Sequence, residues 1–188
     1  NVPFLPDADP AGGVVTDAID FAAAKGEIEA VSFVVRPDAD YEKVDVVPSD
    51  LKGPDGATIP ASAADVALVK VWFRPDSRWN SSWSGNQAKP TLINNLVIHD
   101  DALVKVDFSY PDGPVYLDMS HTDLQTHLNN DCEPIHDAPK FVPFDLRKDF
   151  RQQYLVTWKV PKDAKPGEYK GTIDLKTSKA QNLKQLSI

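Results

Sequence analysis

The sequence predicts an all-β protein, an antiparallel β-sandwich of the immunoglobulin-like or jelly-roll-like type with room for one or two short helices. Residues 152–160 and 168–177 alternate apolar and polar side chains on either side of a Pro/Asp/Gly turn, which is typical of half-buried strands. Residues 65–74 are largely apolar on both faces, as in a central strand. The 16 prolines fall mostly in predicted loops, which favours many strands joined by long connections.

The two segments around this turn predict an antiparallel pair of strands. Each has one apolar face, made by Tyr154, Val156, Trp158 and Val160 before the turn and by Tyr169, Gly171, Ile173 and Leu175 after it. Pro161 and Pro166 cannot donate to a sheet and mark the strand ends. Tyr169 stands where an immunoglobulin-like sandwich can place a tyrosine whose hydroxyl bonds back to the backbone.

Further strands are expected from the same alternation. They cover residues 27–36, 43–47, 65–74, 103–108, 115–119 and 183–188. Residues 92–99 fit a short helix or an irregular segment, and residues 15–24 are ambiguous. Residues 120–146 have weak periodicity, and a segment of that length is usually functional or packed against something. Trp72 and Trp158 lie in strands and are expected in the core.

The length of 188 residues and the hydrophobic fraction of 41% predict a single domain over residues 1–188, with an irregular lead-in at 1–14. The last predicted strand runs to Ile188 without a closing turn. We therefore expect an excised part of a longer chain that continues after residue 188.

The acidic charge argues against two classes of partner. A net charge of −8 and a pI near 4.9 do not suit nucleic acid or an anionic membrane surface, which attract basic patches. The sequence also lacks an apolar run of about 18 residues, the length of a membrane-spanning helix. The lone Cys132 excludes a disulfide within the chain.

Five segments together resemble a known family. They are G-E-I-E-A-V-S-F-V-V (26–35), S-D-L-K-G-P-D-G-A-T-I-P (49–60), V-K-V-W-F (69–73), N-N-L-V-I-H-D-D-A-L-V-K-V-D (94–107) and V-P-K-D-A-K-P-G-E-Y-K-G-T-I (160–173). In this order and spacing they resemble the N-terminal β-sandwich domain of large bacterial secreted proteins related to glycoside hydrolase family 123. In that family the sandwich precedes a (β/α)-barrel that carries the catalytic carboxylates.

The resemblance implies a non-catalytic accessory module of a secreted or periplasmic polysaccharide-degrading enzyme. Such a module packs on a catalytic barrel of the same parent chain or extends its cleft. The barrel itself needs about 250 residues, and this chain has no room for it. No catalytic residue is therefore assigned here. No cofactor is expected either. Three alternatives stay open: an independent carbohydrate-binding module, a structural or adhesive immunoglobulin-like module without a ligand, and an enzyme in its own right.

A polar loop supplies the candidate carbohydrate-binding residues. Trp79 and Trp83 lie four apart in R-W-N-S-S-W-S-G-N, and an indole offers a flat apolar face for stacking on a sugar ring. Neighbouring amides that suit hydroxyl groups are Asn80, Asn86 and Gln87. The alternative is that both rings pack on the sandwich or on another domain.

Two metal hypotheses are weaker. Asp100, Asp101 and Asp107, with Asp7 and Asp9 earlier in the chain, offer the oxygen ligands that Ca²⁺ prefers, but charged turn residues are the simpler interpretation. His121, His127, Cys132 and His136 are zinc-ligand types whose spacing matches no standard zinc motif. Solvated loop histidines explain the second group better.

Overall fold

The computed structural model describes residues 15–74, 91–109, 115–117, 136–179 and 181–188. Within these ranges the chain forms twelve β-strands and three short 3-10 turns. The strands are β1 Ile28–Val35, β2 Tyr41–Pro48, β3 Leu51–Lys52, β4 Thr58–Ile59, β5 Ala64–Arg74, β6 Thr91–Ile98, β7 Val104–Val106, β8 Val115–Leu117, β9 Phe144–Leu146, β10 Gln152–Lys159, β11 Thr172–Lys176 and β12 Asn182–Ser187. The turns are η1 Pro54–Gly56, η2 Ala61–Ala63 and η3 Asp101–Leu103.

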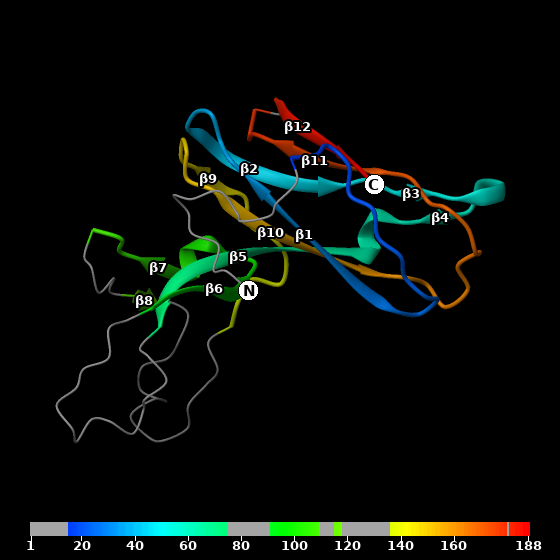
Figure 1. The fold of residues 1–188 in the computed structure, drawn as a ribbon, viewed down its shortest axis with the longest axis horizontal. Coiled ribbons are helices and arrows are strands. Elements are labelled where there is room, and N and C mark those ends of the chain that lie inside the picture. The colour runs from blue at the N-terminus through cyan, green and yellow to red at the C-terminus, as the bar shows by residue number, and fades with distance from the viewer. Residues whose placement is uncertain (1–14, 75–90, 110–114, 118–135, 180) are drawn as a thin grey trace, which may run out of the picture.

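Two four-stranded sheets form the sandwich. One has the order β1-β10-β5-β6 and the other β12-β11-β2-β9, and the pairs within both are antiparallel. Figure 1 shows β2, β11 and β12 as one layer over β1, β10 and β5. The small β3–β4 hairpin stands at one end of the molecule, and the β7–β8 hairpin stands at the other. The predicted all-β sandwich is confirmed.

The pairing predicted around the Pro161–Gly167 turn is wrong. Residues 152–160 and 168–177 do contain β10 and β11, but these strands lie in different sheets. β10 pairs with β1 and β5, whereas β11 pairs with β12 and β2. Alternation reports only that one face of a strand is buried, and the inner faces of both sheets satisfy it equally well.

Residues 92–99 form most of strand β6, so the expectation of a helix or an irregular segment is wrong. β6 pairs with β5, and the register slips between Lys70 and Val71, where Leu96 faces Lys70 and Asn94 faces Val71. Asn95 is therefore the extra residue of a β-bulge. The bulge changes the phase of the alternation within T-L-I-N-N-L-V-I, which explains why a simple period-2 pattern is absent.

The core lies between the two sheets. Its most buried side chains come from both sheets and are Val44, Leu68, Tyr154, Val156, Trp158, Ile173 and Leu175. Val66 to Val69 are all buried, as predicted for a central strand. Trp158 is in the core at 1% exposure. Trp72 is only half-buried, and its indole N–H donates to the Asn95 Oδ1 at 2.9 Å, so its predicted core position is wrong.

The tyrosine predicted after the turn is confirmed. The Tyr169 hydroxyl donates to the Lys165 carbonyl at 3.0 Å, four residues upstream. Its ring covers Gly53, where an added Cβ would lie within 2.6 Å of the Tyr169 Cδ1 and Cζ atoms. Gly53 immediately precedes η1, so the tyrosine ties the turn between β10 and β11 to the β3–β4 hairpin.

The remaining predicted strands are mostly confirmed, although their bounds differ: β2 is longer than predicted, whereas β1 and β7 are shorter. β7 and β8 pair across the predicted 111–114 turn, which lies outside the described residues. β9 pairs with β2 and lies near the end of the 120–146 segment, where no strand was predicted. Across the described part of the chain, no helix is long and apolar enough to cross a membrane.

Candidate ligand-binding groove

A groove of about 460 Å³ lies at the end of the sandwich where the two sheets meet the η3–β7 segment. β5 and β10 of the first sheet line one side, and β9 of the second sheet lines the other. The segment 147–151 between β9 and β10 completes the wall. This volume falls within the range of about 300–1,000 Å³ that small-molecule sites occupy.

Three aromatic rings contact one another at this groove, and two of them, Phe108 and Phe150, line it. Phe108 contacts both Phe73 and Phe150, with ring centroids 5.9 Å and 5.8 Å away. The three rings come from β5, from the residues after β7 and from the segment before β10. Phe108 stays 39% exposed, so its two neighbours hold a ring that still faces solvent. Tilted and edge-to-face contacts of this kind stabilise ring positions.

The charges that line the groove are unbalanced. Its described lining residues include the basic side chains of Lys70, Lys105, Arg147 and Arg151 and the acidic side chains of Asp101 and Asp145. The formal charge of this lining is therefore +2, in a chain whose net charge is −8. The described part of the groove lining is thus a local basic patch on an acidic protein.

Most of these charged groups already have structural contacts. Lys70 Nζ lies 2.6 Å from Asp101 Oδ1 and donates to the Asp101 carbonyl at 2.7 Å, which attaches η3 to β5. Asp145 accepts a hydrogen bond from the Lys43 backbone N–H. Arg151 is buried and donates to the Asp149 carbonyl. Arg147 is different, because its exposed guanidinium lies over the Phe150 ring at 4.4 Å.

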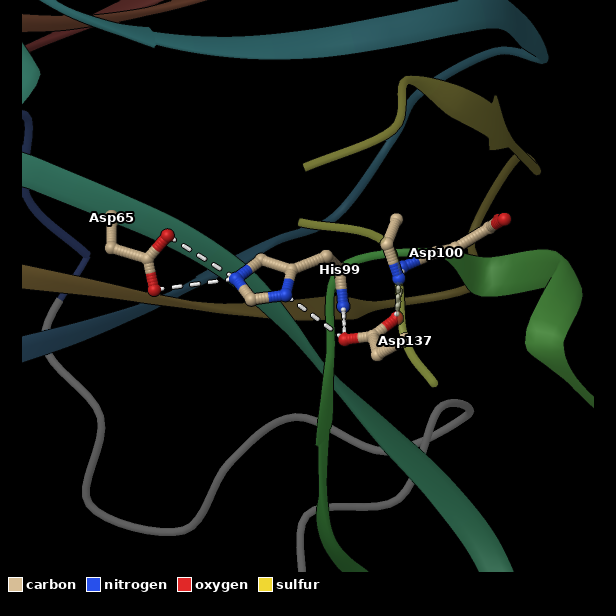
Figure 2. A network of polar contacts seen from close by, with 5 residues as sticks. Asp65, His99, Asp100 and Asp137 are labelled. Atoms are coloured by element: carbon tan, nitrogen blue, oxygen red, sulfur yellow. Dashed lines mark hydrogen bonds and ion pairs between the residues drawn. The ribbon is translucent and has the colours of Figure 1, made fainter. Parts of the chain in front are cut away.

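A histidine held between two aspartates lies after β6. The His99 Nδ1 is 2.9 Å from Asp137 Oδ2, and its Nε2 is 3.2 Å from both carboxylate oxygens of Asp65. Figure 2 shows the imidazole between the two carboxylates. Asp137 also accepts backbone N–H bonds from His99, Asp100 and Ala138. These contacts hold the segment 136–138 against the end of β6, so the arrangement is structural.

The three candidate calcium ligands lie in the η3–β7 region but bind other partners. Asp100 caps η3 by accepting from the Ala102 N–H at 2.9 Å, and Asp101 holds Lys70. The hydroxyl and N–H of Ser109 bind the Asp107 carboxylate and hold the pKa of Asp107 below its ordinary value. In the described ranges, no three His, Cys, Asp or Glu side chains are grouped to hold a metal ion. The calcium site stays a prediction.

The predicted sugar-binding residues lie outside the described ranges. These are Trp79, Asn80, Trp83, Asn86 and Gln87. Asp7, Asp9, His121, His127 and Cys132 also lie outside them, and the remaining zinc candidate, His136, is an exposed residue. The loop hypothesis and the zinc hypothesis therefore stay sequence-based predictions.

Sequence reasoning missed the aromatic groove and the His99 contacts. Phe73, Phe108 and Phe150 are separated by 35 and 42 residues, and no short motif connects them. The segment D-L-R-K-D-F-R (145–151), with three basic residues beside an aromatic one, is the local signal that could have pointed to the groove. His99 and Asp137 are 38 residues apart, and their contact depends on the folded arrangement of the chain, which the sequence spacing does not predict.

The fold, but not the sequence, is similar to that of a known protein. No protein-family model matches the sequence, and no curated protein matches it. The fold is similar to a solved structure of a family 123 glycoside hydrolase from Clostridium perfringens that hydrolyses glycolipid glycans, with a TM-score of 0.52 and 15% sequence identity. The match covers 88% of this chain and 21% of that enzyme. The sandwich therefore corresponds in fold to about a fifth of a family 123 enzyme.

Proposed function

We propose that this chain is a non-catalytic accessory module of a polysaccharide-degrading enzyme related to glycoside hydrolase family 123. In this proposal the sandwich packs on a catalytic barrel of the same parent chain or extends its cleft, in a secreted or periplasmic protein. The observation that carries the proposal is the asymmetry of the structural match, which covers 88% of this chain but 21% of the enzyme. A module that forms one part of a larger hydrolase would produce this asymmetry.

The charges of the groove agree with an accessory role. Glycoside hydrolysis needs one carboxylic acid to protonate the leaving group and a second carboxylate across the scissile bond. The two groove carboxylates instead serve as anchors, since Asp101 is paired with Lys70 and Asp145 binds the Lys43 N–H. A groove whose carboxylates are occupied in this way suits ligand binding rather than hydrolysis of a glycosidic bond.

A glycosidase assay of the 188-residue chain tests the non-catalytic claim. We expect no hydrolysis of a panel of chromogenic glycosides above the rate in buffer. Turnover that follows the folded chain through purification would make it an enzyme in its own right and would overturn the proposal.

A glycan-binding panel separates the proposal from its main alternative. The wild-type chain is compared with a Trp79→Ala/Trp83→Ala double variant whose fold is checked by circular dichroism. Binding that disappears in the folded double variant would favour an independent carbohydrate-binding module. The accessory role predicts that the double variant leaves any glycan binding unchanged.

A further inference from the structure

We propose that the groove between β5, β9 and β7 binds an acidic saccharide, with a sugar ring on Phe108 and its anionic substituent on Arg147. The choice of a saccharide rests on the proposed function, whereas the choice of an anion rests on the groove alone. The residues named for this site come from other segments of the sequence than the Trp79 and Trp83 loop, which lies outside the described residues.

The aromatic ring supplies the stacking surface. Phe108 is 39% exposed although it lies in a concave site, and its ring contacts those of Phe73 and Phe150. A ring held in this way loses little freedom when a ligand binds, so ligand contact costs little conformational entropy. The C–H face of a pyranose is the apolar surface that fits a phenyl ring.

Arg147 supplies the anion-binding group. Its guanidinium lies 4.4 Å above the Phe150 centroid and makes no ion pair with a residue of the described ranges. The cation–π contact holds the guanidinium beside the Phe150 ring while the side chain stays exposed, and the N–H fork of a guanidinium matches a carboxylate or a sulfate. Lys105 lies on the same groove, is exposed, and adds a second positive charge, which the nearby Asp107 carboxylate offsets in part.

The other charged groups of the groove leave this excess intact. The Lys70–Asp101 pair is neutral as a unit, and its contact at 2.6 Å is partly shielded because the Lys70 side chain is only 13% exposed. Among the described lining residues, the formal charges of Asp145 and Arg151 cancel. The positive charges of Arg147 and Lys105 are then left beside the exposed Phe108 ring. This combination favours a ligand with one anionic group attached to a sugar ring that has an apolar face.

Titration calorimetry on the 188-residue chain tests this site. The probes are an oligosaccharide of hexuronic acid, a neutral hexose oligosaccharide of the same length and linkage, and a sulfated form of the neutral one. We expect the hexuronate or the sulfated probe to bind, and the neutral probe to bind at least about tenfold more weakly, as the loss of a charged hydrogen bond implies. The tighter of the two acidic probes identifies the anion.

Two variants and one matched control locate the binding. Arg147→Gln removes the charge of an exposed side chain, and Phe108→Leu keeps an apolar side chain but removes the aromatic face. Each should weaken the acidic probe roughly tenfold. Arg36→Gln is the control, because Arg36 is exposed, pairs with Asp149 and does not line the groove. It should leave affinity within about twofold.

Three results would overturn this inference. They are equal affinity for neutral and acidic probes, affinity that Arg147→Gln leaves unchanged, and absence of binding by every probe. None of them bears on the accessory role, which the glycosidase assay decides separately. Conversely, Arg147-dependent binding by a chain that also hydrolyses glycosides would support the site and contradict the proposed function.

Discussion

Among the aspartates around His99, Asp137 makes the most hydrogen bonds to backbone N–H groups. One carboxylate accepts three backbone N–H groups and contacts the His99 ring, thereby joining the segment before β9 to the end of β6. Asp65 reaches the other side of the same ring from β5, but its side chain is 61% exposed against 26% for Asp137. We therefore expect Asp137 to contribute more to the free energy of unfolding than Asp65.

Asp137→Ala should lower the free energy of unfolding by about 2–3 kcal/mol, because it leaves three N–H groups without their charged acceptor. Asp65→Ala removes an exposed contact and should cost less than about 1 kcal/mol. Urea unfolding of both variants measures the difference. Equal losses would contradict the structural role given to Asp137.

Tyr154 carries a hydroxyl group that is buried and has no hydrogen-bond partner among the described residues. Burial raises the pKa of Tyr154 well above its ordinary value of 10.0, so the hydroxyl is neutral, and it makes no hydrogen bond in the described part of the chain. Tyr154→Phe should therefore raise the free energy of unfolding by about 1 kcal/mol. Tyr169→Phe, which breaks the bond to Lys165, should lower it by about 1 kcal/mol in the same thermal or urea melt. A destabilised Tyr154→Phe would show that the hydroxyl is satisfied.

The contact between Tyr169 and Gly53 shows how one turn fixes the end of the sandwich at the element scale. Gly53 has φ of −114°, which any residue tolerates, so its need for glycine comes from the Tyr169 ring alone. Gly53→Ala should displace the ring and cost about 1–3 kcal/mol. Gly56→Ala is the control, with φ of +75° and no atom within 4 Å of the added Cβ, so its cost is backbone strain of about 1 kcal/mol. A Gly53→Ala variant as stable as wild type would contradict the contact.

The pairing of β11 with β12 should make stability sensitive to acid. The Gln185 amide and then Lys176 hold the pKa of Asp174 below its ordinary value of 3.8. Because the folded pKa is the lower one, this stabilisation is complete above about pH 4 and is lost as pH falls through the folded pKa. Asp174→Asn should cost about 1–2 kcal/mol at pH 7.

Urea melts of Asp174→Asn and wild type at pH 7 and below pH 3 measure this effect. The difference between the two proteins should shrink at the lower pH. Asp17→Asn, which removes one partner of an exposed pair with Lys184, should show little difference at either pH. A difference for Asp174→Asn that grows in acid would contradict the account.

The sequence was enough to predict elements whose pattern is simple and local. β1, β2, β5 and β10 alternate or are apolar throughout, and each was predicted within a few residues of its bounds. β6 was missed because the bulge at Asn95 breaks its alternation, and β9 was missed because three residues carry too little pattern. The sheet to which β11 belongs depends on long-range pairing, which periodicity does not report.

At the scale of the whole molecule, the two ends of the sandwich differ in character. Figure 1 shows the β3–β4 hairpin at one end and the β7–β8 hairpin at the other. Tyr169 packs on the turn before η1 beside the β3–β4 hairpin, whereas β7 contributes to the lining of the basic aromatic groove. The groove could not be predicted from the sequence, because its residues come from both sheets and meet only after folding. Carbohydrate binding by the Trp79 and Trp83 loop remains a prediction that rests on the local composition of the sequence.

The central claim is that this sandwich serves a larger hydrolase. The most direct measurement compares hydrolysis of acidic and neutral polysaccharides by the product of the complete reading frame and by the same product lacking residues 1–188. We predict that the complete product is a hydrolase and that the deletion lowers its rate on polysaccharide, while the isolated 188 residues remain inactive. A reading frame without hydrolase activity, or hydrolysis that resides in residues 1–188 alone, would contradict the account.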